Sequence, residues 1–495
     1  MIRYISTRGK GQPRTAASAV IKGIAEDRGL FVPEAVPSLP FQPGDMVGRP
    51  YKDIAEAVIG AFFDDYTPEE IRRCVDGAYD EKFEAEDIVP VVEAGGAHFL
   101  ELYHGRTAAF KDMALSILPY LMTTAVRKEK EDKQIVILTA TSGDTGKAAL
   151  EGFADVEGTQ IIVFYPSDGV SEVQKRQMTT QEGANTHVFG IRGNFDDAQT
   201  GVKRIFDDRA YNEKLEETGC RLSSANSINI GRLVPQVAYY VYGYIKLIEK
   251  GVIKDGEPVN FVVPTGNFGN ILASYYASLM GIPVRQFICA SNRNKVLTDF
   301  FNTGVYDIHR DFHVTYSPSM DILISSNLER LLYHLSGNPE EIASLMEQLS
   351  EKGVYTVGET IRNGLDQFRG GFADDEDTLR TIADVYEKEG YLMDTHTAVA
   401  YKVYRDYREE TGDDTPALIA STASAYKFAS NVASALGLPE AEDGFAAVRE
   451  LEARTGVPVP SGLRDLDQKT VLHDSVIGKD ELGEAIFASL QGEEK

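Results

Sequence analysis

Lys111 is the residue with the clearest chemical potential in this sequence. It precedes residues 113–126, which carry no charged side chain, and this pattern predicts a helix buried on nearly all sides. On that helix Ala114, Leu115 and Leu118 would form an apolar stripe beside the lysine. Burial there would lower the pKa of Lys111 and favour the neutral amine that forms a Schiff base with a carbonyl compound. Taken alone, the pattern is also compatible with a lysine at a helix end whose ammonium group reaches solvent.

Two glycine-containing loops follow predicted strands and precede predicted helices. Residues 141–146 read Thr-Ser-Gly-Asp-Thr-Gly, whose hydroxyl and amide groups could hold a carboxylate, and residues 266–270 read Gly-Asn-Phe-Gly-Asn. Small residues and successive backbone N–H groups at a helix N-terminus are what phosphate binding requires. The loop 266–270 lacks a lysine and matches neither nucleotide-binding motif, the Walker loop or the dinucleotide fingerprint. The alternatives are an ordinary tight turn at 266–270 and a capped helix start at 141–146.

The order of predicted elements indicates an α/β protein. Strands are predicted at residues 135–138, 161–164, 186–189, 259–263, 284–290 and 416–420, and helices at 171–182, 231–249, 271–280, 339–353 and 426–436. Strands joined by crossover helices predict parallel sheets with ligands beyond the carboxyl ends of the strands. Before this series the helical signals include Thr67, an N-cap followed by proline. A loop is predicted at 374–377, and the function of residues 291–390 is not readable from the sequence.

These patterns predict three domains. The first is helical and spans residues 1–95. A smaller α/β domain spans residues 96–220 and contains Lys111 and the loop 141–146. A larger α/β domain spans residues 221–495 and contains the loop 266–270 and a helical C-terminal tail.

Composition excludes several classes of partner. The chain has 495 residues, 43% of them hydrophobic, with 50 basic and 76 acidic side chains and a net charge of −26. This charge repels nucleic acids and anionic lipid, so an anionic substrate would need a local cationic pocket. The three cysteines are widely spaced and match no metal-binding pattern, so we expect no metal site. No signal peptide or membrane-spanning run is recognised, and we expect a cytoplasmic protein, a monomer or weak homodimer.

Four motifs in the same order give the sequence a family resemblance. They are residues 104–112, which end in Phe-Lys-Asp, residues 141–146, residues 226–232 (Asn-Ser-Ile-Asn-Ile-Gly-Arg) and residues 266–270. Together they resemble the pyridoxal-phosphate enzymes of the tryptophan synthase β-subunit type, and within them the threonine synthase family. The resemblance extends to residues 4–9 and 29–34 and implies two doubly wound parallel-sheet domains with a helical N-terminal domain. Two departures are Arg106, where proline is usual, and Ser424-Ala425, where His-Pro is common.

The resemblance implies conversion of O-phospho-L-homoserine and water to L-threonine and phosphate, with pyridoxal 5'-phosphate as cofactor. Lys111 would bind the cofactor and then move protons at the α and β carbons of the substrate. The loop 266–270 would hold the cofactor phosphate, Thr422 would meet the pyridine nitrogen, and Asp144 would lie near the ring hydroxyl. The implied cofactor-binding residues are Lys111, Gly266, Asn267, Phe268, Gly269, Asn270, Thr422 and Asp144. The implied substrate-binding residues are Thr141, Ser142, Gly143, Thr145, Asn226, Ser227, Asn229 and Arg232.

Other functions stay open at this point. A threonine or serine dehydratase of the same fold would use the lysine and a carboxylate-binding loop but needs no second anion site, so residues 226–232 discriminate. A non-catalytic pyridoxal-phosphate-binding homologue would not require the intact Lys111. Arg232 is expected to hold the departing phosphate, with a salt bridge between two elements as the alternative. His104 and His396 are expected to be hydrogen-bonded structural residues.

Overall fold

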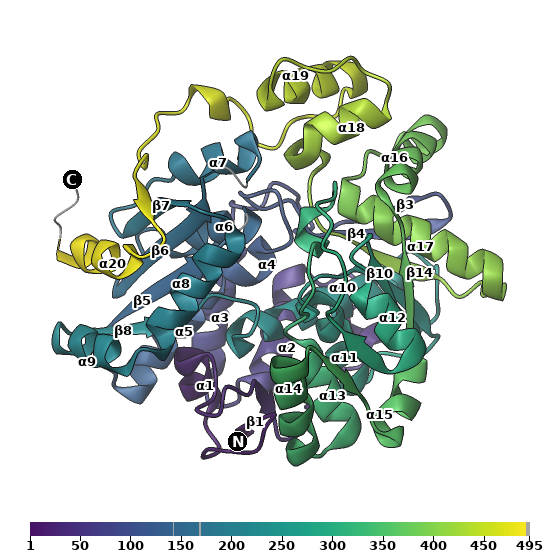
Figure 1. Cartoon of the computed structure of the whole chain (residues 1–495). Coiled ribbons are helices and arrows are strands. Elements are labelled where there is room, and N and C mark those ends of the chain that lie inside the picture. Colours follow the sequence, from purple (N-terminus) through teal and green to yellow (C-terminus); the bar gives the residue numbers. More distant parts are fainter. Residues whose placement is uncertain (142, 168–169, 492–495) are drawn as a thin grey trace.

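The computed structural model describes residues 1–141, 143–167 and 170–491, and two sheets dominate it (Figure 1). The larger sheet has six strands in the order β13 (Phe368–Phe372), β10 (Val284–Ser291), β9 (Val259–Pro264), β14 (Ala417–Ser421), β4 (Ala97–Glu101) and β3 (Val91–Ala94). The smaller sheet has five strands in the order β15 (Val476–Gly478), β7 (Thr186–Arg192), β6 (Thr159–Pro166), β5 (Gln134–Ala140) and β8 (Cys220–Ser223). All these neighbours are parallel except β3 and β4. The predicted α/β fold is confirmed.

Helices cover both sheets. They include α6 (Asp144–Phe153), α7 (Glu172–Thr179), α8 (Phe195–Asp207), α9 (Arg209–Glu217), α11 (Gly269–Met280), α12 (Val296–Thr303), α13 (Leu328–Ser336), α14 (Pro339–Lys352), α15 (Glu359–Gly364), α17 (Thr395–Thr411), α19 (Gly444–Thr455) and α20 (Leu482–Gln491). Short 3-10 turns are η1 (Pro43–Met46), η2 (Pro318–Met320), η3 (Leu365–Gln367) and η5 (Leu466–Gln468), and β11 (Val305–Asp307) pairs with β12 (Val354–Thr356).

The strands of each sheet do not all come from the segment expected to form it, which was 96–220 for the smaller domain and 221–495 for the larger. Strand β4 pairs with β14 in the larger sheet, although it lies in the segment expected to form the smaller domain. Strand β15 comes from the expected helical tail and pairs with β7 in the smaller sheet (Figure 1). Both are short strands, of five and three residues, whose local pattern does not reveal which distant strand they pair with. The chain therefore passes between the two sheets three times, after β4, after β8 and after β14.

The N-terminal region packs against a long buried helix. It contains β1 (Tyr4–Ser6) paired with β2 (Phe31–Pro33), and the helices α1 (Ala16–Lys22), α2 (Tyr51–Phe62) and α3 (Pro68–Ala78). Thr67 caps α3, as the sequence predicted, and exchanges hydrogen bonds with Glu70 in a capping box. Helix α2 packs along α10 (Ile230–Glu249), where the Tyr51 and Tyr242 rings lie edge to face with centroids 5.4 Å apart. This packing holds α10, the helix whose first turn carries Arg232, against the N-terminal region.

The apolar segment after Lys111 is two helices rather than one. Helix α4 (Asp112–Leu115) ends after four residues, and α5 (Leu118–Glu129) begins three residues further along the chain. Pro119 lies in the first turn of α5, where its missing N–H group costs no helical hydrogen bond. The prediction of a single helix was therefore wrong, because the proline starts a helix instead of interrupting one.

Two other predicted elements differ in detail. Residues 374–377 were predicted as a loop, but Asp374 caps α16 (Asp375–Glu389), and acidic residues in a first helical turn interact favourably with the helix dipole. The helix predicted at 426–436 is a 3-10 turn, η4 (Ala425–Phe428), followed by α18 (Ala429–Ala435). The acidic residues 374–377, which were interpreted as a loop, therefore mark the start of α16.

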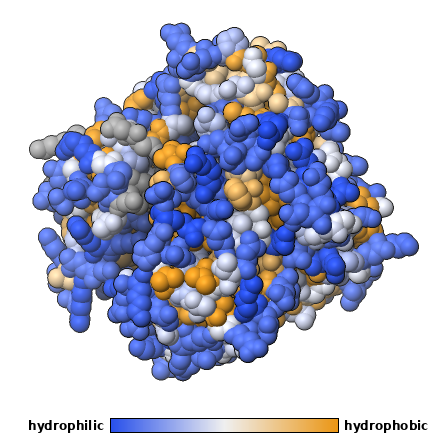
Figure 2. All heavy atoms as spheres, turned by 45° about the vertical axis from the view of Figure 1, so that its right-hand side comes forward, coloured by the Kyte–Doolittle hydropathy of each residue, from blue (hydrophilic) through white to orange (hydrophobic). Residues whose placement is uncertain are grey.

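The surface in Figure 2 is dominated by hydrophilic residues, with hydrophobic residues in small separate patches. Across the described residues, no helix is both long and apolar enough to cross a membrane.

Helix α13 carries a half-buried histidine, His334, that should make stability depend on pH. His334 Nε2 lies 2.8 Å from the Tyr276 hydroxyl, and burial, aided by the charge of Arg330, lowers the pKa of His334 to about 4. Unfolding returns that pKa to about 6.5, so this contribution to stability is complete above that pH and is lost as pH falls. Between about pH 7.5 and about pH 5 the free energy of unfolding should fall by about 2 kcal/mol through this residue.

The variant His334→Gln should lack this part of the pH dependence when unfolding by urea is compared at the two pH values. The exposed His309 provides the control, since His309→Gln should keep the dependence of the unchanged chain. Equal pH dependence in His334→Gln and the unchanged chain would contradict the assignment.

Candidate active site

The predicted site residues meet where strands of both sheets end. Loop 266–270 follows β9, Thr422 follows β14, and the segment leading to Lys111 follows β4, three adjacent parallel strands of the larger sheet. Loop 141–146 follows β5 of the smaller sheet. The expectation that a ligand lies beyond the carboxyl ends of parallel strands agrees with this placement.

Lys111 is buried at the N-terminus of α4. Its Nζ lies 3.5 Å from Asp144 Oδ2 and 3.4 Å from Ser319 Oγ. Burial lowers the pKa of Lys111; the charge of Asp144 opposes this, and the charges of Arg232 and Lys427 add to it. The predicted lowering of the Lys111 pKa and its predicted cause, burial, are both present.

The backbone before Lys111 is tied to the end of β14. The Phe110 N–H donates to the Thr422 carbonyl at 2.8 Å, and the Ser424 N–H donates to the Ala108 carbonyl at 3.0 Å. Ala108 has φ of +56°, a left-handed conformation that is strained for a residue with a side chain. This bridge places Thr422 beside the lysine segment.

A buried carboxylate fixes the turn that leads into α4. Asp112 accepts hydrogen bonds from the backbone N–H of Thr107 at 2.8 Å and from its hydroxyl, and burial raises the pKa of Asp112 to about 6. Gly105 lies so close to Asp112 that a side chain there would clash with the carboxylate. Arg106, one of the two departures, instead points outward and pairs with Glu151 at 3.0 Å, so it leaves the turn intact.

Asp144 is the acidic centre of the site. Besides its contact with Lys111, its Oδ1 accepts hydrogen bonds from Gln174 Nε2 at 2.8 Å and lies 2.9 Å from Lys427 Nζ. Burial by itself would raise the pKa of Asp144, but the charges of Lys427 and Lys111 hold it well below its usual range. Asp144 is therefore an ionised carboxylate shared by two lysines.

The other residues of loop 141–146 have differing environments. The Thr141 hydroxyl accepts from the N–H groups of Gly143 at 3.0 Å and Gly146 at 2.9 Å, so it shapes the loop itself. Gly143 has φ of +141° and no room for a side chain, because a Cβ would lie 2.6 Å from Gln174. Thr145 is half-buried in the first turn of α6, and Ser142 lies outside the described residues.

Loop 266–270 is arranged to receive an anion. Its carbonyl groups are satisfied: Gly266 O accepts from Ser325 Oγ at 2.7 Å, and Asn267 O accepts from Asn327 N at 3.0 Å. By contrast, the backbone N–H groups of residues 267–270 have no acceptor among the described residues. Phe268, with φ of +65°, turns this row of N–H groups onto the N-terminus of α11. Such a row is what a phosphate group requires.

Asn270 adds a side-chain donor to this loop. Its Oδ1 accepts from the hydroxyls of Tyr239 at 2.6 Å and Tyr240 at 2.7 Å. Its Nδ2 is buried and has no hydrogen-bond partner in the described part of the chain. A buried amide without a partner is costly, so this atom fits a bound acceptor such as a phosphate oxygen.

A second cationic group acts on Lys111 from α10. Arg232, in the first turn of α10, is buried, and its Nη1 donates to the Ala225 carbonyl at 2.9 Å. Burial lowers the pKa of Arg232 to about 10, and among the described residues it forms no salt bridge. The alternative of a salt bridge between two elements is therefore absent from the described contacts. A buried guanidinium without an acidic partner is a strong candidate for binding an anionic ligand.

The segment before Arg232 contains one structural cap, Asn229, and two half-buried polar residues, Asn226 and Ser227. Asn229 Oδ1 accepts from Gly231 N at 2.9 Å, and its Nδ2 donates to the carbonyls of Val20 at 3.0 Å and Ser224 at 3.1 Å. Its side chain has no donor left for a substrate. Asn226 and Ser227 are half-buried, and a Cβ on Gly269 would lie 3.7 Å from the Ser227 Cβ, so the segment adjoins loop 266–270.

The sequence did not reveal three contributors to the site. Lys427 follows the motif at 421–425 and was predicted only as part of a helix. Ser319 contacts Lys111 from η2, in the region 291–390 where no pattern was readable. Gln174 reaches Asp144 from α7. A charged residue just after a strand-end motif is the one signal that could have identified Lys427.

Both histidines considered in the sequence are hydrogen bonded to carboxylates. His104 Nε2 lies 2.8 Å from Glu101 Oε2, and His396 Nδ1 lies 2.9 Å from Asp394 Oδ1. His396 Nε2 accepts from the Ser319 N–H at 3.1 Å and so holds the turn that contacts Lys111. These contacts are of the structural kind that was expected.

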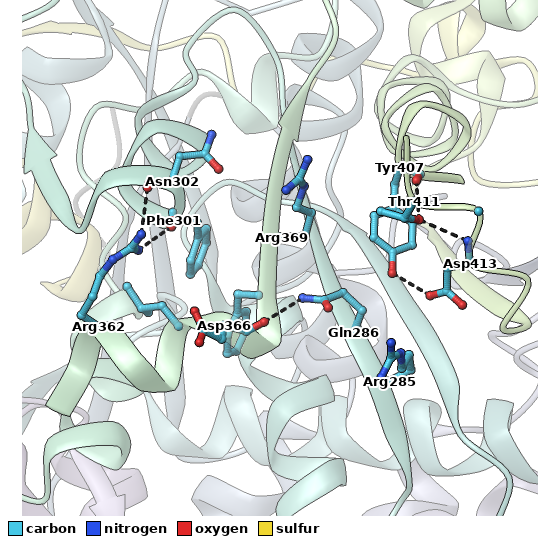
Figure 3. Close-up of a pocket in the computed structure, with 13 residues that line it drawn as sticks. Arg285, Gln286, Phe301, Asn302, Arg362, Asp366, Arg369, Tyr407, Thr411 and Asp413 are labelled. Carbon is cyan, nitrogen blue, oxygen red and sulfur yellow. Dashed lines mark hydrogen bonds between the residues drawn. The ribbon is translucent and has the colours of Figure 1, made fainter. Parts of the chain in front are cut away.

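A cavity of about 660 Å³ lies elsewhere, at the amino-terminal ends of β10 and β13 (Figure 3). Arg362 donates to the carbonyls of Phe301 and Asn302 there, and Arg369 pairs with Glu410. Two of its three arginines are thus engaged by the protein, and none of the predicted site residues lines it.

A buried lysine beside an ionised carboxylate, together with a phosphate-receptive loop at the ends of parallel strands, defines the class of pyridoxal-phosphate-dependent enzymes. Residues 3–79 match the family described as "Threonine synthase N terminus", residues 95–422 match "Pyridoxal-phosphate dependent enzyme", and residues 397–467 match "Threonine synthase, C-terminal". The chain belongs to the threonine synthase family, and the cofactor of that family is pyridoxal phosphate.

Relatives and solved structures agree with this membership. Threonine synthase from Pseudomonas aeruginosa is 38% identical over 435 residues, covering 86% of this chain and 89% of the relative. Threonine synthase-like 1 from Pongo abelii is 40% identical over 460 residues, covering 88% of this chain, which spans only 61% of that relative. The crystal structure of pyridoxal-phosphate-bound threonine synthase from Brucella melitensis is 34% identical, with a TM-score of 0.87 and 99% of each chain covered.

The two glycines of loop 266–270 should respond differently to substitution by alanine. A Cβ at Gly266 would clash with the Ser319 carbonyl, whereas the nearest atom to a Cβ at Gly269 is 3.6 Å away. Gly266→Ala should therefore lower the unfolding temperature of the cofactor-free chain and weaken pyridoxal-phosphate binding, by about tenfold or more. Differential scanning fluorimetry and cofactor titration measure the two effects.

Gly269→Ala is the matched control and should leave the cofactor-free unfolding temperature unchanged. If it nevertheless weakens cofactor binding, the cofactor phosphate occupies the space beside Gly269. An unfolding temperature and cofactor affinity unaltered by Gly266→Ala would show that the loop geometry does not matter.

Proposed function

We propose that this chain converts O-phospho-L-homoserine and water into L-threonine and phosphate. The observation that carries the proposal is Arg232, a buried guanidinium with no acidic partner among the described residues, present in addition to the phosphate-receptive loop 266–270. Two anion sites suit a phosphate-bearing cofactor and a phosphate-bearing substrate together. A dehydratase of the same fold would need only the first. The overall charge of −26 makes such local cationic groups necessary for binding a phosphorylated substrate.

The cofactor would be held by residues from both sheets. Lys111 would bind it covalently, the N–H groups of residues 267–270 and Asn270 Nδ2 would bind its phosphate, and Thr422 would meet its pyridine nitrogen. The bound cofactor supplies an electron sink that stabilises negative charge developing on the substrate carbons. Asp144, which contacts both Lys111 and Lys427, would lie near the ring hydroxyl of the cofactor.

Lys111 would act as the base in the reaction. A neutral amine can take protons in succession from the substrate α and β carbons, and the ammonium group so formed can return protons to the γ carbon, which becomes the methyl group of threonine, and finally to the α carbon. Burial lowers the pKa of Lys111 and so favours that neutral form, while the carboxylate of Asp144 accepts a hydrogen bond from the ammonium group when the lysine is protonated. A single lysine with an adjustable charge thereby serves several proton transfers.

Arg232 would stabilise the departing phosphate. Cleavage of the bond between the γ carbon and the phosphate oxygen leaves the bonding electrons on phosphate, and a fixed guanidinium favours that build-up of charge. The half-buried Asn226 and Ser227 would add hydrogen bonds, and the N-terminus of α10 would add its dipole. Water then adds at the β carbon, so the products are threonine and one phosphate.

Thr141, Gly143 and Thr145 would shape the pocket for the substrate carboxylate at the N-terminus of α6. Ser142, which lies outside the described residues, is proposed for the same role because of its position in the loop 141–146. We further propose that the enzyme acts on this free small molecule in the cytoplasm, as a monomer or weak homodimer.

Turnover of O-phospho-L-homoserine tests the function and the role of Arg232 together. The unchanged chain should release phosphate and threonine in equal amounts. Arg232→Ala should bind the cofactor normally but lose kcat/KM by about a hundredfold or more. Arg232→Lys should restore little, because a point charge does not reproduce a two-pronged contact with phosphate.

The exposed Arg449, which pairs with Asp467, supplies the control variant Arg449→Ala, expected to keep full turnover. Near-normal turnover by cofactor-loaded Arg232→Ala would remove Arg232 from the site. Release of 2-oxobutanoate in place of threonine would favour the dehydratase.

Covalent labelling tests the role of Lys111. Borohydride reduction of the cofactor-loaded chain should fix pyridoxal phosphate to the peptide that contains Lys111, as read by mass spectrometry. Lys111→Ala should carry no fixed label, and Lys147→Ala, which removes a lysine paired with Glu151 at 2.9 Å, should be labelled like the unchanged chain. A label on any other lysine would refute the assignment.

A further inference from the structure

Lys427 is a fully buried lysine that joins three segments at the site. Its Nζ donates to the Thr107 carbonyl at 2.9 Å and to Gln177 Oε1 at 3.0 Å, and lies 2.9 Å from Asp144 Oδ1. These three acceptors use all three N–H groups of an ammonium. Its side chain is 0% exposed, so its charge cannot reach solvent. A buried cation held in this way is fully compensated by the protein.

Asp144 is shared unequally between the two lysines. Its Oδ1 is 2.9 Å from Lys427 Nζ, whereas its Oδ2 is 3.5 Å from Lys111 Nζ. The second contact of Lys111, with Ser319, is also long at 3.4 Å. Two ammonium groups beside one buried carboxylate leave an excess positive charge, which burial disfavours. The proton that is lost most easily is the one on the lysine with fewer and longer hydrogen bonds.

We infer that Lys427 is a positioning residue that carries the permanent charge balancing Asp144, so that Lys111 is left as the neutral amine. The inference rests on the proposed role of Lys111 as the cofactor lysine. If Lys427 were absent, Lys111 would be the cation nearest to the Asp144 carboxylate and would be held there as an ammonium. Lys427 thus separates the two tasks of balancing a buried acid and offering a reactive amine.

The other charged groups around Lys111 and Lys427 either also lower the pKa of Lys111 or are hydrogen bonded to other groups. Arg232, from α10, adds positive charge that disfavours a protonated Lys111. The charge of Lys427 also lowers the pKa of Asp112, which lies in α4. Asp112 is hydrogen bonded to Thr107, whose carbonyl accepts from Lys427. Asp144 is therefore the acidic group through which Lys427 influences Lys111.

The test measures the pH dependence of cofactor capture by the full chain freed of pyridoxal phosphate, because only a neutral lysine captures the aldehyde. The rate is followed by absorbance across a pH series. Lys427→Met should move the midpoint of the rate profile upward by about one pH unit or more. Lys427→Arg, which keeps the charge, should remain near the unchanged chain. Lys128→Met is the control, since Lys128 pairs with Glu70 at 2.9 Å in the N-terminal region.

A second substitution keeps the test informative if Lys427→Met is unstable. In Lys427→Met combined with Asp144→Asn, no carboxylate remains to hold a proton on Lys111, so the midpoint should move back down from its value in Lys427→Met. Lys427→Gln with Asp144→Asn replaces the ion pair by a neutral hydrogen-bonded pair and should give the same low midpoint in a more stable chain.

An unshifted midpoint in Lys427→Met, with the borohydride label still on Lys111, would overturn this inference alone. The same conclusion follows if replacing Lys427 lowers only the unfolding temperature and adding Asp144→Asn does not change the midpoint of the rate profile. Capture at a different lysine would overturn the proposed role of Lys111, and the inference with it.

Discussion

The site depends on one buried carboxylate, Asp144, held between two lysines. An ionised acid in the protein interior is stable only when charges and hydrogen bonds compensate it, and here Gln174, Lys427 and Lys111 do so together. Asp144 belongs to the smaller sheet's first helix, whereas the lysines come from segments that follow strands of the larger sheet. The same interaction therefore joins the two sheets and sets the protonation of the reactive amine.

The anion sites are built by a different physical device. In loop 266–270 the carbonyl groups are satisfied by neighbouring elements, so the N–H groups are left pointing to the space where a phosphate would bind. Arg232 achieves the same effect with a side chain, since only a backbone carbonyl of the described chain receives its hydrogen bond. Because the molecule as a whole is strongly acidic, these local donors and not the overall field would select a phosphorylated substrate.

Much of this arrangement is predictable from the sequence, because strand-to-loop-to-helix junctions have local signatures. The strands before loops 141–146 and 266–270, the cap at Thr67 and the start of α10 all lie where periodicity and capping residues indicate them. Prediction fails where the determining contact is distant in the chain. Strand β15 pairs with β7 across nearly 300 residues, and its three residues carry no local sign of that partner.

The site shows the same division. Lys111 and Arg232 stand out by residue type and position. Asn229 also matches its motif, but its Oδ1 caps α10 and its Nδ2 donates to the Val20 carbonyl. Lys427 and Ser319 could not be ranked from the sequence, because their importance comes from burial and from atoms that approach only in the folded chain. Burial of a charge is a property of packing, and composition or spacing does not report it.

The most direct test of the account is a crystal structure of this chain with pyridoxal phosphate and an unreactive phosphonate analogue of O-phospho-L-homoserine. The account predicts the cofactor on Lys111 with its phosphate on the N–H groups of residues 267–270, and the phosphonate on the guanidinium of Arg232. A phosphonate bound elsewhere, with Arg232 still bonded only to the Ala225 carbonyl, would contradict the central claim that this buried arginine awaits the substrate's phosphate.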